Sequence, residues 1–168
     1  MQQVMTYFER PEPLTEHICP GRFGLPVNKT LYGCLQSLFK FHPRYDKMWG
    51  DILRQDPNGV LVLLEGRHIK WTEELRLRLT KANPDVAHRI CFVPRLDRES
   101  YLALVHTCDV LLDTPVFCGG NTSLEAFAMG TPLVTIPTEQ LRGRITHALY
   151  KQMGVTACVA RSLEEYVN

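Results

Sequence analysis

Five short apolar runs alternate with helical patterns along this chain, and that alternation limits the folds it can adopt. The run from 60 to 64 is continuously apolar, as in a strand that is covered on both faces of a sheet. Strands are predicted at 30–35, 60–64, 90–93, 110–112 and 133–136. Strands that alternate with helices are typical of a parallel sheet with right-handed crossovers. We therefore expect an α/β fold: a Rossmann-like parallel sheet with helices on both faces.

Helical periodicity fills the segments between these strands. Apolar side chains recur at i, i+3, i+4 and i+7 from Tyr45 to Leu53, which indicates an amphipathic helix. The turn-forming residues 56–59 end it. Further helices are predicted at about 72–82, at 98–106 and at 145–153, and Leu124, Phe127 and Ala128 line one face of a short helix after a glycine-rich turn. Ser162 and Glu165 have the spacing of a capping box, which predicts one more short helix.

Length and composition suit one soluble domain. The chain has 168 residues, 45% of them hydrophobic and 22% charged. Residues 1–28 are rich in proline and predict an irregular N-terminal segment, and residues 29–168 are expected to form the lobe. The formal net charge of +1 predicts neither a nucleic acid nor an anionic membrane as partner. Any anion site must therefore be local.

The six cysteines form no CxxC pair, and most of them lie in or beside apolar runs. This pattern favours reduced, partly buried thiols over disulfides or a zinc site. The N-terminus has no pattern of a signal peptide, and no run reaches the ~20 apolar residues that a membrane span needs. A cytoplasmic location is the simplest expectation.

A glycine-rich turn after the fourth predicted strand is the strongest candidate for a ligand site. In an open α/β sheet, ligands bind at the carboxyl ends of the strands. Gly119 and Gly120 allow close approach of the backbone and positive φ, and Asn121, Thr122 and Ser123 then open a helix, where an anion is favoured. A plain capping box between Thr122 and Glu125 explains the same residues. Both interpretations stay open on the residues alone.

Two more strand ends carry candidate charges. Lys40 follows the first strand and could neutralise a phosphate held by the glycine turn, although a solvated surface lysine is the plainer interpretation. Arg98 and Tyr101 lie one turn apart at a helix start and could flank a base, and a solvated first turn is their plainer interpretation. No Asp-x-Asp pair is present to hold a metal–diphosphate complex, so no metal site is expected.

At these residues the chain resembles the C-terminal catalytic lobe of the O-linked N-acetylglucosamine transferase/SPINDLY family. Five ordered blocks between about residues 22 and 166 carry the resemblance, which makes it more specific than any single motif. The blocks are Tyr32–Pro43, Ile90–Pro94, Asp109–Pro115, Gly119–Glu125 and Gly130–Thr135.

The resemblance implies a GT-B architecture, in which the C-terminal lobe of two Rossmann-like lobes holds most of a nucleotide-sugar donor. It implies that Lys40 contacts the donor diphosphate and that Asn121 and Thr122 bind phosphate at the helix start. Glu125 takes the position of an acid that binds the ribose. The positions that contact uracil are matched by Leu96, Arg98 and Tyr101. Gln36 lies near the family's donor-binding glutamine, one residue out of register relative to Lys40 in the animal enzymes.

Some positions depart from the animal enzymes. Gly120 and Tyr101 stand where those enzymes carry histidines, and Arg98 stands where they carry a lysine. Arginine keeps the charge of that lysine and changes its geometry. The identity of the base and of the sugar is therefore open between UDP-N-acetylglucosamine and other nucleotide-sugars, including the GDP-fucose associated with the SPINDLY branch.

The predicted function is that of a donor-binding lobe of a metal-independent, inverting glycosyltransferase with protein Ser/Thr hydroxyls as acceptors. The family's N-terminal lobe, which holds its histidine candidates for the general base, and its tetratricopeptide repeats have no counterpart in these 168 residues. They are therefore expected as partners, and the chain by itself is expected to transfer little or no sugar. The alternatives are a non-catalytic module that binds a nucleotide or a protein, and another GT-B-like enzyme such as a nucleotide-sugar epimerase.

Overall fold

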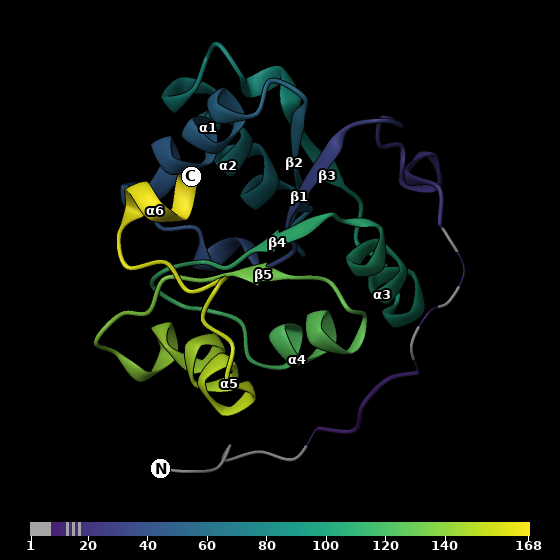
Figure 1. Cartoon of the computed structure of the whole chain (residues 1–168). Coiled ribbons are helices and arrows are strands. Elements are labelled where there is room, and N and C mark those ends of the chain that lie inside the picture. The colour runs from purple at the N-terminus through teal and green to yellow at the C-terminus, as the bar shows by residue number, and fades with distance from the viewer. Residues whose placement is uncertain (1–7, 13, 15, 17) are drawn as a thin grey trace.

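The computed structural model describes residues 8–12, 14, 16 and 18–168, and its centre is one parallel sheet. The strands lie in the order β3-β2-β1-β4-β5 (Figure 1). Their bounds are Thr30–Cys34 for β1, Gly59–Leu64 for β2, Ile90–Val93 for β3, Val110–Leu112 for β4 and Leu133–Val134 for β5. The Rossmann-like parallel sheet predicted from the sequence is confirmed.

Helices cover both faces of this sheet. Figure 1 shows α1, α2 and α6 on one face and α3, α4 and α5 on the other. The helices are α1 (Asp46–Gln55), α2 (Ile69–Ala82), α3 (Arg98–Thr107), α4 (Asn121–Ala128), α5 (Ile145–Met153) and α6 (Leu163–Val167). Short 3-10 turns are η1 (Pro20–Phe23), η2 (Leu38–Lys40), η3 (Pro43–Tyr45), η4 (Ala87–Arg89) and η5 (Leu141–Gly143).

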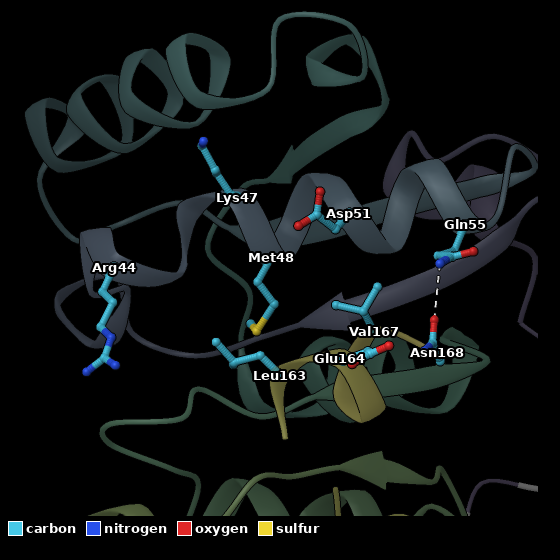
Figure 2. Close-up of a pocket in the computed structure, with 9 residues that line it drawn as sticks. All are labelled: Arg44, Lys47, Met48, Asp51, Gln55, Leu163, Glu164, Val167 and Asn168. Atoms are coloured by element: carbon cyan, nitrogen blue, oxygen red, sulfur yellow. Dashed lines mark hydrogen bonds between the residues drawn. The ribbon is translucent and has the colours of Figure 1, made fainter. Parts of the chain in front are cut away.

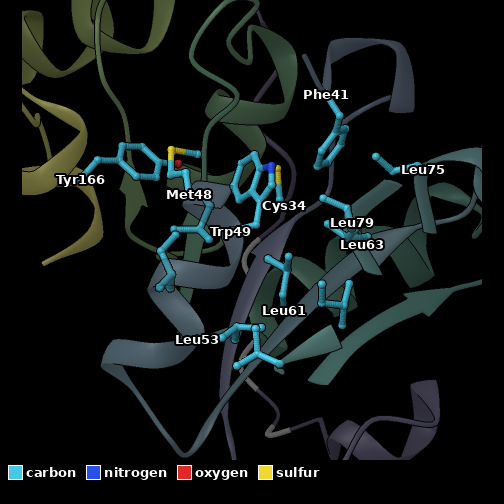
Figure 3. Packing of buried hydrophobic residues seen from close by; sticks show 14 of the residues in the cluster. Cys34, Phe41, Met48, Trp49, Leu53, Leu61, Leu63, Leu75, Leu79 and Tyr166 are labelled. Atoms are coloured by element: carbon cyan, nitrogen blue, oxygen red, sulfur yellow. The ribbon is translucent and has the colours of Figure 1, made fainter. Parts of the chain in front are cut away.

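The apolar stripe predicted from 45 to 53 packs α1 onto the sheet. Trp49 is 1% exposed, and its ring lies 5.5 Å from that of Phe41, centroid to centroid. Figure 3 shows Trp49 among side chains from β2, α2 and α6, including Leu61, Leu63 and Tyr166. Fully burying one such large apolar side chain contributes about 1.5–3 kcal/mol to folding.

The second face explains why β2 is apolar at every position. Leu61 and Leu63 belong to the core under α1 and α2, whereas Val60 and Val62 belong to the core under α3 and α4. Successive strand residues point to opposite faces. A strand that is covered on both faces therefore has no position for a polar side chain.

The structure differs from some of the predicted bounds. α2 begins at Ile69 rather than about 72, and β5 ends at Val134 rather than 136, whereas α4 begins at Asn121, as the predicted helix start after the glycine turn requires. Beyond β5, Thr135 donates its N–H to the carbonyl of Cys158 at 3.0 Å and accepts the N–H of Ala160 at 2.8 Å. No pattern in the sequence predicts that pairing. The segment around 158–160 extends the sheet edge by a single bridge.

Four smaller expectations concern a helix cap, the cysteines, membrane spans and the N-terminal segment. Ser162 caps α6 as predicted, since its hydroxyl accepts the N–H of Glu165 at 3.1 Å. All six cysteines are free thiols. In the described part of the chain no helix has the length and apolar character of a membrane span. The division at residue 28 stays a prediction, and part of its first segment, residues 1–7, 13, 15 and 17, lies outside the described residues.

Two buried tyrosine hydroxyls give a matched test of the packing. The hydroxyl of Tyr166 donates to the carbonyl of Asp113 at 2.8 Å, so Tyr166→Phe is expected to lower the free energy of unfolding by about 1 kcal/mol. The hydroxyl of Tyr101 is buried without a partner among the described residues, so Tyr101→Phe is expected to cost nothing or to stabilise. Urea unfolding measures both changes. A larger loss for Tyr101→Phe than for Tyr166→Phe would contradict this packing.

Candidate functional site

The strand order changes direction between β1 and β4. From β1 the chain proceeds to β2 and β3 on one side and then returns to β4 on the other side of β1. The loops after β1 and β4 therefore leave the same edge in opposite directions, which is where ligands bind in open α/β sheets. Gln36 and Lys40 lie on the first loop, and the Gly119–Ser123 turn ends the second.

Lys40 joins these two loops. Its ammonium group donates to Gln36 Oε1 at 2.7 Å and to the carbonyl of Cys118 at 3.0 Å. It also lies 4.6 Å from the ring centroid of Phe117. A solvated surface lysine would make no such set of contacts, so that interpretation is wrong. The structure brings Lys40 to the glycine turn, as a shared site requires.

The charge of Lys40 is set by two opposing effects. Partial burial lowers the pKa of the ammonium group, and the carboxyl of Asp113 raises it again. The net pKa lies below that of an ordinary lysine. Any attraction of Lys40 for an anion is therefore lost as pH rises through this lowered pKa, at a lower pH than for an ordinary lysine.

Gln36 extends the contact from Lys40 to α4. The side chain of Gln36 is buried, and its amide donates to the hydroxyl of Thr122 at 2.9 Å. Thr122 lies in the first turn of α4, whose N-cap is Gly120, and no side chain caps this helix. The capping-box interpretation of Thr122 and Glu125 is therefore wrong. The first N–H groups of a helix without such a cap are available to an anion.

Gly119 is needed for packing rather than for an unusual backbone angle. Neither Gly119 nor Gly120 has positive φ, so that part of the sequence interpretation is wrong. A β-carbon on Gly119 would overlap the hydroxyl of Ser123 and lie 2.8 Å from that of Thr122. A β-carbon on Gly120 would meet nothing within 4 Å. Only the second glycine leaves open space at the helix start.

Ser123 is engaged inside the fold. Its side chain is fully buried, and its hydroxyl lies 2.8 Å from the hydroxyl of Thr146 on α5. Asn121, at the first position of α4, is exposed. Within the predicted phosphate turn, Asn121 therefore faces solvent while Ser123 ties α4 to α5.

A second group of predicted residues meets where α3 and α4 pack together. Arg98 opens α3 and is exposed, and Leu96 and Tyr101 are half-buried. Burial raises the pKa of Glu125 on α4, and the charge of Arg98 lowers it, so the two side chains are close enough to interact. The buried hydroxyl of Tyr101 has no partner in the part of the chain that the structure describes.

Asp113 is a buried residue beside the glycine turn that no pattern in the sequence singled out. It directly follows β4 and is 0% exposed, and its Oδ1 accepts the N–H of Gly119 at 2.7 Å. The signal in the sequence was an acidic residue at the end of an apolar strand, in the loop that leads to the glycine turn.

Elsewhere, a groove lies between α1 and α6 (Figure 2). Met48 and Leu163 line it, and Gln55 donates to Asn168 across its end at 3.1 Å. None of the predicted site residues lines this groove. Among the described residues, no cluster of three or more His, Cys, Asp and Glu side chains could hold a metal ion.

Comparison with known proteins gives the family. The model of glycosyl transferase family 41 matches residues 13–168. The chain belongs to glycosyl transferase family 41. The resemblance to the O-GlcNAc transferase/SPINDLY family seen in the five blocks is thus confirmed.

Two curated family 41 relatives are much longer than this chain. The probable UDP-N-acetylglucosamine–peptide N-acetylglucosaminyltransferase SEC of Arabidopsis thaliana is 30% identical over 146 residues, which are 86% of this chain and 15% of the relative. The UDP-N-acetylglucosamine–peptide N-acetylglucosaminyltransferase of Caenorhabditis elegans is 30% identical over 148 residues, 88% of this chain and 13% of the relative. The chain thus spans about one seventh of each.

Solved structures agree with the family 41 assignment. A mutant of the O-GlcNAc transferase of Thermobaculum terrenum superposes with a TM-score of 0.74 and 28% identity, over 85% of this chain and 29% of that chain. The Anabaena protein HepE, solved with UDP and glucose, superposes at 0.53 over 70% of this chain and 32% of that chain. HepE is only 18% identical, so it supports the fold alone: a lobe of the GT-B type.

The two adjacent glycines give a matched test of the turn. Gly119→Ala is expected to lower the free energy of unfolding by about 1–3 kcal/mol, because the added methyl group overlaps Ser123 and crowds Thr122. Gly120→Ala meets open space and is expected to leave stability within about 0.5 kcal/mol. Thermal and urea unfolding of both variants provide the measurement. Equal losses at the two positions would contradict the packing of Gly119.

Proposed function

We propose that this chain is the donor-binding lobe of a metal-independent, inverting glycosyltransferase that transfers N-acetylglucosamine or another sugar from a nucleotide-sugar to protein Ser/Thr hydroxyls. The observation that carries the proposal is the hydrogen-bonded chain from Lys40 through Gln36 to Thr122. It joins the half-buried ammonium group of Lys40 to the start of α4, which no side chain caps. Membership of family 41 supports the reaction class.

The diphosphate would occupy the space between Lys40 and the first turn of α4. The ammonium group supplies a positive charge, and Gly120, Asn121 and Thr122 supply backbone N–H groups at the positive end of the helix dipole. Leaving-group departure builds up negative charge on the diphosphate, and donors that are already held in place stabilise it. These residues thus serve both binding and leaving-group stabilisation.

The nucleoside would lie toward α3. Glu125 would accept hydrogen bonds from ribose hydroxyls, and a base could pair with the Tyr101 hydroxyl, which has no partner among the described residues. Leu96 and Arg98 are the other two candidates for contact with the base. Since Tyr101 and Arg98 differ from the residues of the animal enzymes, UDP-sugars and GDP-fucose are both candidate donors.

The acceptor side of the site is expected to come from a second lobe. Three aromatic side chains are exposed: Phe39 at 70%, Trp71 at 46% and Phe117 at 37%. The ring centroids of Phe39 and Phe117 lie 5.9 Å apart, and the Phe117 ring contacts Lys40. Exposed apolar surface of this kind marks an interaction site. The partners we propose are the N-terminal lobe with its general base, the tetratricopeptide region and a protein acceptor. The cytoplasmic location stays a prediction.

A non-catalytic module that retains the fold is the second candidate. It is favoured by Gly120 and Tyr101, which stand where the animal enzymes of the resembling family carry histidines. Such a module need not bind a nucleotide-sugar at all, so binding distinguishes the two.

Calorimetric titration tests the site directly. UDP, GDP and their sugars are titrated into the wild-type chain, Lys40→Ala and the control Lys47→Ala, which removes an exposed lysine on α1. Loss of a charge-assisted phosphate contact at Lys40 is expected to cost about 1.5–3 kcal/mol of binding free energy. Lys47→Ala is expected to bind as wild type does. Unchanged affinity of Lys40→Ala would remove Lys40 from the site.

A transfer assay tests the need for a second lobe. The 168-residue chain, incubated with radiolabelled UDP-N-acetylglucosamine and a Ser/Thr peptide, is expected to bind donor weakly and to release no glycosylated product. The reason is that the proposed general base belongs to the second lobe, and none of the candidate site residues of this chain takes that role. Product formation by this chain alone, abolished by Lys40→Ala, would refute the proposed division between lobes.

A further inference from the structure

We propose that Asp113 is the positioning residue of the donor site: its buried carboxyl group fixes the Gly119 turn and balances the charge of Lys40 without touching the donor. This inference rests on the proposed function. It starts from burial, because Asp113 is 0% exposed, and a carboxylate is rarely buried completely unless donors or charges compensate it.

The carboxyl group ties the glycine turn to the neighbouring strand. Its Oδ1 accepts the N–H of Gly119 at 2.7 Å, and its Oδ2 accepts the hydroxyl of Thr135 at 2.9 Å. Gly119 immediately precedes Gly120, the N-cap of α4. The position of the Gly119 backbone therefore sets where the first N–H groups of α4 lie.

The main chain of Asp113 is held as firmly as its side chain. Its N–H donates to the carbonyl of Val134 at 2.9 Å, and its carbonyl accepts the hydroxyl of Tyr166 at 2.8 Å. All four polar groups of the residue are thus hydrogen-bonded to the 134–135 segment, α6 or the turn. Asp113 is thus fixed in position, and its hydrogen bond to Gly119 holds the turn in place.

The charge of Asp113 acts on Lys40. Three titratable groups act on the ammonium group by charge: Asp113 and Cys118 from the loop after β4, and Cys34 from β1. Burial raises the pKa of both thiols, which favours their neutral forms, and Asp113 has the largest charge effect of the three on Lys40. Burial also raises the pKa of Asp113, and the Thr146 hydroxyl, the hydrogen bonds from Gly119 and Thr135 and then the charge of Lys40 oppose that rise. Both carboxyl oxygens accept hydrogen bonds, which favours the ionised carboxylate.

The substitution Asp113→Asn removes this charge and keeps the shape. Asparagine retains an oxygen that can accept the N–H of Gly119, and its amide can donate to Thr135. We expect UDP affinity at pH 7 to fall about tenfold. The carboxylate no longer fixes the Gly119 turn at the start of α4, and its negative charge no longer acts on Lys40. We also expect the pKa of Lys40 to fall further, so the loss of affinity with rising pH should occur at lower pH than in wild type. Calorimetry between about pH 7 and pH 10 measures both effects.

Amide hydrogen exchange of Gly119 reports on the turn without any ligand. In a ¹⁵N-labelled chain, the amide of Gly119 is expected to exchange faster with solvent in Asp113→Asn, because a carboxylate accepts a stronger hydrogen bond than an amide does. Thr135→Val removes one hydrogen bond to Asp113 and no charge. It is expected to weaken UDP binding without moving its pH dependence, and it carries the test if Asp113→Asn does not fold.

Asp46→Asn is the matched control. Asp46 is also buried and lies 2.7 Å from Arg78 Nε, yet it belongs to α1 and is not hydrogen-bonded to the turn. This variant is expected to lose stability while UDP affinity, its pH dependence and the Gly119 amide stay as in wild type.

The outcomes separate the two proposals. If wild type binds UDP, and Asp113→Asn binds it equally well with the same pH dependence, the role of Asp113 is refuted and the donor site stands. If wild type binds no nucleotide, the proposed function fails. The Gly119 amide then decides alone: faster exchange in Asp113→Asn supports the fixing of the turn, and unchanged exchange overturns it.

Discussion

Parallel pairing of β4 with β1 is the constraint on which the rest of this molecule depends. It brings the loop that follows residue 34 to the loop that follows residue 112, although the two are far apart in the sequence. Every contact of the candidate diphosphate site crosses between these loops or lies within one of them: Lys40 with the carbonyl of Cys118, Lys40 with Gln36, and Gln36 with Thr122. A sheet with the strands in simple sequence order would separate these groups.

The elements of the fold could be predicted because their signals are local. A strand covered on both faces is apolar throughout, as β2 is, and a helix on one face has an apolar stripe, as α1 does with Trp49 at its centre. The capping box was wrong because it takes no account of distant contacts. Gly120 occupies the N-cap position of α4, and the Thr122 hydroxyl accepts the amide of Gln36, which comes 86 residues earlier.

The candidate site was predictable in position and less so in detail. A glycine pair before a helix and a lysine after a strand were enough to predict that Lys40 and the glycine turn lie together at one edge of the sheet. The reason for Gly119 was not visible, since it lies in the side chains that crowd it and not in its own backbone angles. Asp113 was missed because one acidic residue in a loop has no pattern, and its importance appears only when its exposed fraction and partners are known. Proximity of Arg98 to Glu125 likewise depends on how α3 meets α4.

The hydrogen bond from Tyr166 to the carbonyl at the end of β4 also orders events during synthesis. Domains begin to form from the N-terminal side while the chain is still emerging from the ribosome. β1, β4 and the glycine turn are complete by residue 123, but the loop between them receives this anchor only after another 43 residues (166 − 123) have been made. In a nascent chain the loop after β4 therefore lacks this anchor until α6 has emerged and Tyr166 has packed into the core beside α1.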